Sequence, residues 1–340
     1  MDYTLTLLIS FLISVLLTPV FRKIALVFNI LDYPVSDIKT HKIATPYLGG
    51  LAIAFSFFLT LFLVRLTTHF PTGTLRSLRG IIFGSIIILL LGLIDDFKYK
   101  GIHYTTKFIG EVVAAIILVQ YGIKVNFITP EWFALLVTFL WIIGITNALN
   151  LIDVMDGLSS GIGIISSLGL FLISRFIEEE IYVGYASISL AGACLGFLPY
   201  NLSNRYKIFM GDTGALFLGF VLSALTLGGR YSVNNQLGVL SPLYILFVPI
   251  YETILISMLR LKRGQSPFIG SKDHFSLRLL TIGFGKSKVL IISYIISSLI
   301  CCAGLIIVLS KTIAIPVILT CLLTLFIIIA TRYLTKVEIQ

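Results

Sequence analysis

Long apolar runs, separated by short polar connections, recur along the whole 340-residue chain. A helix needs about 20 apolar residues to cross the hydrocarbon core of a bilayer, and most of these runs approach that length. Because lipid offers no hydrogen bonds, backbone polar groups must pair within each run, which favours helices. We therefore predict an all-α, polytopic membrane helix bundle with about eleven transmembrane helices, at residues 4–21, 47–64, 80–94, 105–120, 131–149, 157–175, 182–200, 213–229, 238–259, 288–309 and 312–331.

The composition agrees with a membrane protein rather than with a soluble one. Apolar residues make up 57% of the chain and charged residues only 12%, which is about half the charged fraction of ordinary globular proteins. No repeat of fixed period and no long polar linker interrupts the sequence, so residues 1–340 are predicted to form a single integral membrane domain. The four cysteines lie in apolar runs without metal-ligand spacing and predict no disulfide framework.

The basic residues indicate which side of the membrane each connection faces. The net charge is +9, and most of the 25 Lys and Arg residues fall after the first, third, seventh, ninth and eleventh predicted helices. Cytoplasmic connections are enriched in Lys and Arg, so the N-terminus is predicted outside and the C-terminus in the cytoplasm. The charge therefore reports orientation, and no binding of nucleic acid is predicted. The basic residues on the opposite side are Arg65, Arg76, Arg79, Lys124, Arg175, Arg230 and Lys311.

Carboxylates gather at the predicted cytoplasmic ends of the helices. Asp95 and Asp96 end the third predicted helix, where the helix dipole disfavours anions, and this mismatch favours a functional role over that of ordinary interfacial charges. Asp212 begins the eighth predicted helix. Its alternative role is to cap that helix by accepting the first free amides.

A further polar group follows the fifth predicted helix at a spacing of three. Asn147, Asn150, Asp153 and Asp156 place neighbours in the series on one helical face. Over three such steps the face rotates by roughly 180° on an ideal helix. The helix is therefore predicted to break near Asp153, with Gly157 permitting an irregular turn. Polar side chains at the end of a membrane helix are costly, which favours a function for them.

Carboxylates beside several cations favour phosphate chemistry. Hard oxygen ligands suit Mg²⁺, or Mn²⁺ in its place, and these ions bridge phosphate oxygens. Lys and Arg can neutralise the rest of a polyanionic substrate, and phosphoryl transfer requires mainly positioning and charge stabilisation. The sequence contains neither a Walker loop nor GxGxxG, so no soluble-type ATP or dinucleotide site is predicted. An ion-coupled transporter is the alternative from another class, since it also uses intramembrane carboxylates.

Five motifs together resemble the polyprenyl-phosphate N-acetylhexosamine-1-phosphate transferases of glycosyltransferase family 4. They are KTHKIATPYLGG at 39–50, LIDD at 93–96, NALNLIDVMDGLSSG at 147–161, KIFMGDTGALFLG at 207–219 and RLKRGQSPFIGSKDHFSLRL at 260–279. Members move a sugar 1-phosphate from a UDP-sugar onto a polyprenyl phosphate, such as undecaprenyl phosphate, with Mg²⁺, and release UMP. The resemblance implies a UDP-N-acetylhexosamine donor and an active site on the cytoplasmic face of the cell membrane. By analogy alone it also suggests a homodimer.

The resemblance implies roles for individual residues. Asp95 and Asp96 match the catalytic aspartate pair, one of which orients or deprotonates the lipid phosphate. Asp153 matches a residue that lines the nucleoside and sugar pocket, and we group it with the catalytic residues. Asp212 matches the magnesium ligand and Phe209 the aromatic residue that stacks on uracil. The residues expected to bind substrate are Lys42, Lys107, Asn147, Asn150, Asp156, Phe209, His274 and Arg278.

The chain departs from the family pattern in its last large loop. Relatives often carry further histidines where this chain has Ser276 and Leu277, and Gln where it has Glu111. The phospho-N-acetylmuramoyl-pentapeptide transferase branch is the alternative, but it typically has a run of histidines in this loop, which this chain lacks. The branch that starts O-antigen, teichoic acid or related glycans, with UDP-N-acetylglucosamine as donor, is favoured. For His274 and Arg278, an interfacial amphipathic segment is the other interpretation.

The predicted orientation can be tested with fused reporters. A reporter that is active only in the cytoplasm should be active when it is fused after Gln340, because the basic connections are expected on that side. The same reporter inserted in the connection 65–79 should be inactive. A silent C-terminal fusion would contradict the predicted orientation and the helix count.

Overall fold

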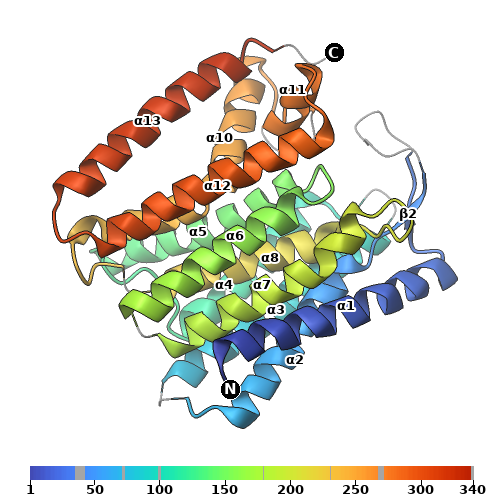
Figure 1. Cartoon of the computed structure of the whole chain (residues 1–340), viewed down its shortest axis with the longest axis horizontal. Coiled ribbons are helices and arrows are strands. Elements are labelled where there is room, and N and C mark those ends of the chain that lie inside the picture. Colours follow the sequence, from blue (N-terminus) through green and yellow to red (C-terminus); the bar gives the residue numbers. More distant parts are fainter. Residues whose placement is uncertain are drawn as a thin grey trace.

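Helices follow one another along nearly the whole chain and lie side by side in a bundle (Figure 1). The computed structural model describes residues 1–34, 43–70, 73–98, 101–178, 180–229, 231–266 and 272–337. Two short strands, β1 (Leu31–Asp32) and β2 (Thr45–Pro46), pair antiparallel beside the bundle. The α-helices are α1 (Tyr3–Val27), α2 (Gly49–Thr67), α3 (Thr74–Phe97), α4 (Tyr104–Gln120), α5 (Glu131–Ile152), α6 (Leu158–Ile173), α7 (Ile181–Leu202), α8 (Gly211–Leu227), α9 (Ser241–Ile245), α10 (Phe247–Lys262), α11 (Phe275–Thr281), α12 (Lys286–Leu309) and α13 (Ala314–Leu334).

The all-α prediction is confirmed, and each of the eleven predicted segments coincides with helical structure. Among the described residues, eight helices are long and apolar enough to cross a membrane. The helices α4 and α8, with 17 residues each, are shorter than that standard. The count of eleven spanning helices therefore stays a prediction, as does the orientation. All four cysteines are free, in agreement with the sequence.

The predicted segment 238–259 is not one continuous helix. It consists of a 3₁₀ turn (Gln236–Leu240), α9 and α10, and the two parts of the segment meet at an angle of 72°. Pro242 and Pro249 explain why the segment bends here instead of forming the predicted single helix. Proline has no N–H to donate within a helix and is tolerated in a first turn, and each of these prolines lies in the first turn of its own helix.

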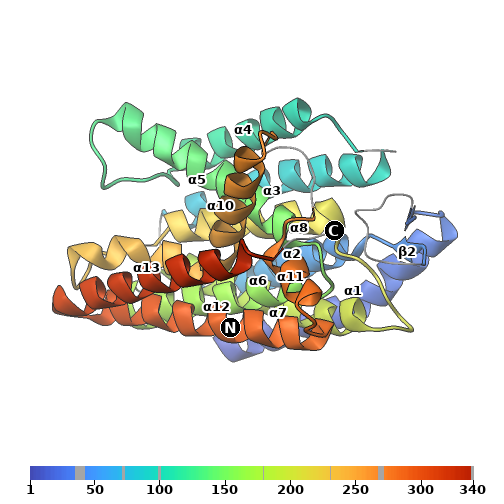
Figure 2. The same cartoon turned by 90° about the horizontal axis from the view of Figure 1, so that it is seen from above.

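The helix α8 lies in the interior of the bundle. Viewed from above, α4 and α5 form one outer side and α12 and α13 the other (Figure 2). Every residue of α8 from Thr213 to Thr226 is buried, as expected of a helix that is apolar all round. Glycines allow neighbouring helices to approach it: a Cβ on Gly92 of α3 would lie 2.6 Å from the Cα of Thr213, and one on Gly50 of α2 would overlap the backbone of Gly214. This approach places the start of α8 against the end of α3.

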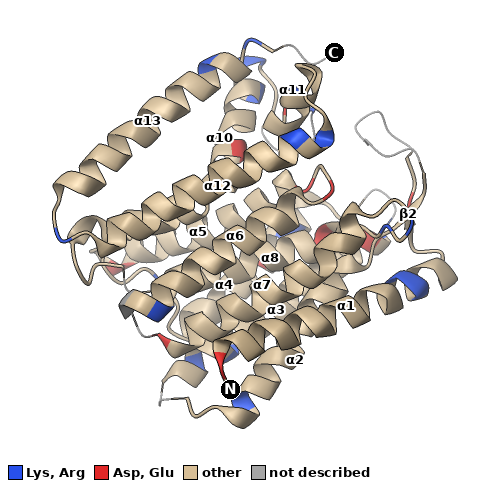
Figure 3. Ribbon diagram, in the orientation of Figure 1, with Lys and Arg blue, Asp and Glu red and all other residues tan. Residues whose placement is uncertain are grey.

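The helices α1 and α7 pack together through small polar residues. Ser10 Oγ donates to the carbonyl of Ser189 at 2.6 Å, and Ser14 Oγ donates to that of Ala193 at 2.7 Å. In lipid, helices associate through such close packing and hydrogen bonds, since apolar burial offers no advantage there. Most of the charged residues lie near the helix ends (Figure 3). The helix α13, at the edge of the bundle, is mostly exposed, as expected of a surface that faces lipid.

Replacing Gly196 of α7 by alanine should destabilise the protein. A Cβ there would lie 2.5 Å from the carbonyl oxygen of Phe11 in α1, and such overpacking costs about 1–3 kcal/mol. Gly144 of α5 is the matched control, because no atom lies within 4 Å of its added Cβ. In thermal unfolding of detergent-purified protein, Gly196→Ala should melt below wild type and Gly144→Ala should not. Equal melting temperatures for the two variants would contradict this packing.

Candidate active site

The two aspartates at the end of α3 have different partners. Asp96 accepts hydrogen bonds from the backbone N–H groups of Asp212 and Thr213, at 2.9 and 3.0 Å, and from the Thr213 hydroxyl at 2.5 Å. The first amides of a helix have no partner within it. Asp96 therefore caps α8 from a neighbouring helix, and the alternative that Asp212 serves only as this cap is wrong.

Lys107, in the first turn of α4, joins the other two aspartates. Its Nζ lies 2.5 Å from Asp95 Oδ2 and 2.5 Å from Asp212 Oδ2. The second oxygen of Asp95 accepts the N–H of Ile102 at 2.6 Å. One ammonium group neutralises only one of the two carboxylates that it bridges, so this part of the site keeps a negative charge.

Polar side chains of α4 and α5 extend the site. Asn147 donates to Glu111 Oε2 at 2.8 Å. Glu111 is buried, and its Oε1 has no hydrogen-bond partner among the described residues. One helical turn along α5, the side chain of Asn150 lies beside the carboxylate of Asp212. The predicted residues Asn147 and Asn150 thus lie on the same side of α5, with Asn150 next to Asp212.

The predicted break after α5 is confirmed. The helix ends at Ile152, and Gly157 takes a positive φ of +82° in the turn that leads to α6. Burial, and then the carboxylates of Asp212 and Asp156, raise the pKa of Asp153 from its ordinary value to about 8. Asp153 is therefore protonated more readily than an ordinary aspartate.

The short segment 207–210, which precedes α8, completes this part of the site. Lys207 Nζ lies 2.6 Å from Asp156 Oδ2 and 5.2 Å from the centre of the Phe209 ring. The backbone N–H of Phe209 donates to Pro46 at 2.8 Å, and its carbonyl accepts the N–H of Gly49 at 3.0 Å. Lys207 was missed in the sequence analysis, although its place two residues before Phe209 was a signal.

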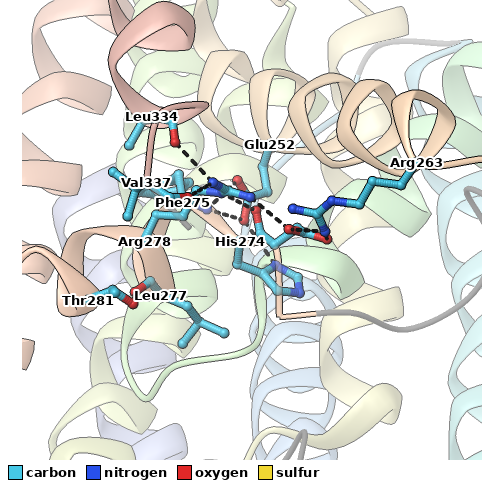
Figure 4. Close-up of polar contacts among 10 residues, drawn as sticks. Glu252, Arg263, His274, Phe275, Leu277, Arg278, Thr281, Leu334 and Val337 are labelled. Carbon is cyan, nitrogen blue, oxygen red and sulfur yellow. Dashed lines mark hydrogen bonds and ion pairs between the residues drawn. The ribbon is translucent and has the colours of Figure 1, made fainter. Parts of the chain in front are cut away.

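His274 is held by a buried carboxylate of α10 (Figure 4). Its Nδ1 lies 3.0 Å from Glu252 Oε1, and Glu252 also accepts the N–H of Phe275 at 3.1 Å. Glu252 is fully buried and His274 is 5% exposed. A hydrogen bond at Nδ1 leaves Nε2 as the nitrogen of the ring that can meet a substrate.

Arg278 is buried, and its guanidinium group is bonded to other groups of the protein (Figure 4). Its Nη2 lies 2.7 Å from Asp273 Oδ1, and its Nη1 donates to the carbonyls of Leu334, at 3.0 Å, and of Val337. These carbonyls lie at the end of α13, where basic side chains commonly satisfy helix C-termini. The interfacial alternative is therefore wrong for Arg278, because its guanidinium lies inside the protein. A contact with substrate stays a prediction for both Arg278 and His274.

The structure joins most of the predicted residues into one network of contacts and neighbouring charges. His274 and Arg278 belong to a separate group, built on Glu252 and Asp273, and Asn147 is bonded to Glu111. Lys42 lies outside the described residues. The roles of all these residues stay predictions. The joined residues are Asp95, Asp96, Lys107, Asn150, Asp153, Asp156, Phe209 and Asp212.

A metal ion would have to bind here with help from substrate or water. Within the part of the chain that the structure describes, no group of three or more His, Cys, Asp or Glu residues could hold a metal ion on its own. Mg²⁺ commonly binds through only one or two carboxylates, with waters and substrate phosphates as its other ligands. The Asp212 side chain is 34% exposed and lies in a negatively charged site, so its oxygens fit such a role.

A polytopic helix bundle with aspartates, lysines and amides at its helix ends defines a membrane protein with a polar site. Residues 78–230 match glycosyl transferase family 4. The chain is 34% identical over 297 residues to the probable undecaprenyl-phosphate N-acetylglucosaminyl 1-phosphate transferase of Bacillus subtilis (strain 168), covering 85% of this chain and 80% of the relative.

Two further relatives represent both branches that the motifs indicated. The decaprenyl-phosphate N-acetylglucosaminephosphotransferase of Mycobacterium tuberculosis (strain ATCC 25618 / H37Rv) is 33% identical over 307 residues, covering 81% of this chain and 74% of the relative. The phospho-N-acetylmuramoyl-pentapeptide-transferase of Halalkalibacterium halodurans is 32% identical over 255 residues, covering 67% and 75%. The chain belongs to glycosyl transferase family 4, which confirms the resemblance and its assignment as a transferase enzyme.

The two aspartates of α3 should differ in their effect on stability. Asp96→Ala removes the cap of α8 and leaves two amides unpaired, which should lower the free energy of unfolding by about 1–2 kcal/mol. Asp95→Ala leaves Lys107 paired with Asp212 and should cost less. Thermal unfolding of the two purified variants checks the order. A smaller loss for Asp96→Ala than for Asp95→Ala would contradict the capping role.

Proposed function

We propose that the enzyme transfers N-acetylglucosamine 1-phosphate from UDP-N-acetylglucosamine to a polyprenyl phosphate, giving polyprenyl-pyrophosphate-N-acetylglucosamine and UMP. The observation that carries this proposal is the site formed by Asp95, Lys107 and Asp212, three polar residues from separate helices in contact at one place. The names of the relatives from Bacillus subtilis and Mycobacterium tuberculosis supply the acceptor class and the sugar.

The chemistry requires charge stabilisation more than a strong base. A lipid phosphate oxygen attacks the β-phosphorus of the donor, a new P–O bond forms, and the bond to the α-phosphate breaks to release UMP. The attacking phosphate already carries negative charge, since the second pKa of a phosphate monoester is about 6. Repulsion between the two anions is the larger obstacle, and Lys107 would lower it when its ammonium turns from Asp95 and Asp212 to the phosphates.

A divalent cation fits the residues that remain. When Lys107 faces the phosphates, Asp95 and Asp212 lose the ammonium group that bridges them. Asp212 would then hold Mg²⁺, or Mn²⁺ in its place, and the ion would neutralise the pyrophosphate when bound. Asp95 would stay close enough to orient the lipid phosphate. The α8 cap made by Asp96 would hold Asp212 in place throughout.

The donor would lie along the turn that follows α5. Phe209 would stack on uracil, with Asn150, Asp153 and Asp156 along the nucleoside and sugar. Asp156 is paired with Lys207 beside the Phe209 ring. Both side chains would therefore lie next to a nucleoside stacked on Phe209 and could bind its polar groups. The acceptor's prenyl chain would lie in the bilayer, and the basic connections favour a site on the cytoplasmic face of the cell membrane.

The muramoyl-pentapeptide donor is the alternative substrate, because the relative from Halalkalibacterium halodurans carries that name. This chain has Ser276 and Leu277 in place of further histidines, and its Arg278 is buried against Asp273 and α13. The last loop thus differs from the run of histidines typical of that branch, which favours the N-acetylhexosamine donor.

Transfer of radiolabel tests the proposal directly. Purified protein in detergent should convert labelled UDP-N-acetylglucosamine and undecaprenyl phosphate into a labelled lipid, and should release UMP in equal amount. The reaction should stop when a chelator removes Mg²⁺ and resume when the ion is restored. No product from this donor, but product from UDP-N-acetylmuramoyl-pentapeptide, would correct the sugar. No product from any UDP-sugar would refute the proposal.

The Asp212→Asn variant tests the metal assignment. It keeps the size of the side chain but removes a hard anionic ligand, so turnover should fall by more than about a hundredfold. Thermal unfolding should still show a folded protein, because the α8 cap comes from Asp96. The same assay on Asp2→Asn, far from the site at the start of α1, serves as the control. Turnover like that of wild type in Asp212→Asn would remove Asp212 from the metal site.

A further inference from the structure

The turn between α5 and α6 carries Asp153 and Asp156 but is irregular. Gly157, where the turn meets α6, has a φ of +82°, outside the range of a regular helix. Such a turn has fewer internal hydrogen bonds than a helix to define its conformation. Its shape therefore depends on the contacts that the rest of the protein makes with it.

A side chain of α7 holds this turn from one side. Asn201 is 4% exposed, and its Oδ1 accepts the N–H of Gly157 at 2.6 Å. Its Nδ2 donates to the carbonyl of Ile208 at 3.0 Å. A single buried amide thus ties the turn 153–157 to the segment 207–210, which carries Lys207 and Phe209.

A side chain of α12 binds the same residue, Gly157. The hydroxyl of Tyr294 donates to the carbonyl of Gly157 at 2.5 Å. Its ring packs on α6, where a Cβ on Gly161 would overlap the ring and one on Gly157 would lie 3.2 Å from the hydroxyl. The two glycines make room for Tyr294, so α12 reaches the turn as well.

We propose that Asn201 and Tyr294 are positioning residues for the UDP-sugar donor. They act through Gly157: one binds its N–H and the other its carbonyl, and together they orient the carboxyl groups of Asp153 and Asp156. The inference rests on the proposed function, since it assumes that these aspartates face the donor. Neither residue touches Asp95, Lys107 or Asp212 in the described contacts.

This arrangement predicts which kinetic constant responds. The turn lies on the donor side of the site, whereas the acceptor phosphate is expected near Asp95 and Lys107. A loosened turn binds the donor less well in both the ground state and the transition state, which raises KM and leaves kcat little changed. The KM for polyprenyl phosphate should stay at its wild-type value.

The first variant removes one hydroxyl and nothing else. Tyr294→Phe keeps the ring on Gly161 and loses the hydrogen bond to Gly157. Loss of one such bond should raise the KM for UDP-N-acetylglucosamine about threefold to tenfold. Tyr185→Phe is the matched control: it loses a hydroxyl bond of the same 2.5 Å length, to Met1, near the opposite end of α7 from Asn201.

A second variant tests whether the two residues act together on Gly157. Asn201→Ala should raise the same KM, and the Asn201→Ala/Tyr294→Phe double variant should raise it by a factor that differs from the product of the single effects, because residues that share a partner couple. Melting temperatures of all variants, measured in parallel, show which of them remain folded. Tyr294→Phe is the conservative change that keeps the experiment decisive if Asn201→Ala does not fold.

The outcomes separate this inference from the function on which it rests. A rise in the donor KM for Tyr294→Phe, absent in Tyr185→Phe, would support it. Kinetic constants of Tyr294→Phe equal to those of wild type, or equal rises in the KM of donor and acceptor, would overturn it while the proposed function stands. Wild-type protein that transfers sugar phosphate from no UDP-sugar would overturn the proposed function, and with it this inference.

Discussion

The contact between the end of α3 and the start of α8 is the interaction on which the site depends. The C-terminal end of a helix is negative and disfavours Asp96, but the N-terminal end of α8 is positive and offers free amides. Asp96 accepts two of those amides and the Thr213 hydroxyl. This carboxylate thereby satisfies the free amides at the start of α8. It also fixes the backbone of Asp212 at a place where its side chain meets Lys107 and Asp95.

Small residues make this contact possible in a membrane protein. Lipid tails are as apolar as leucine, so helices gain little from burying apolar surface and depend on close packing. Gly92 and Gly50 let α3 and α2 approach the backbone of α8 around Thr213 and Gly214. The buried, short helix α8 is thus held on several sides, and its first turn becomes a fixed point for the polar residues around it.

The polar residues divide into two groups with different physical characters. In the first, Asp95, Lys107 and Asp212 form an incompletely neutralised set in which Lys107 and Asp212 remain partly exposed. In the second, Arg278 is 1% exposed and binds Asp273 and the end of α13. The donors of Arg278 thus hold the last loop and the end of α13 together, while His274 stays oriented by Glu252.

The helical bundle, the position of the break after α5 and the aspartates at the helix ends could all be predicted from the sequence, because they depend on the length of apolar runs, on residue spacing and on the rarity of charge in lipid. The five motifs also identified the family. That Asp96 caps α8 while Asp95 faces Lys107, and that Asn201 and Tyr294 both bind Gly157, follows from the tertiary structure alone. Adjacent aspartates look alike in a sequence, and Tyr294 is separated from Gly157 by 137 residues. Their roles depend on contacts between distant helices, and no local period or composition records such contacts.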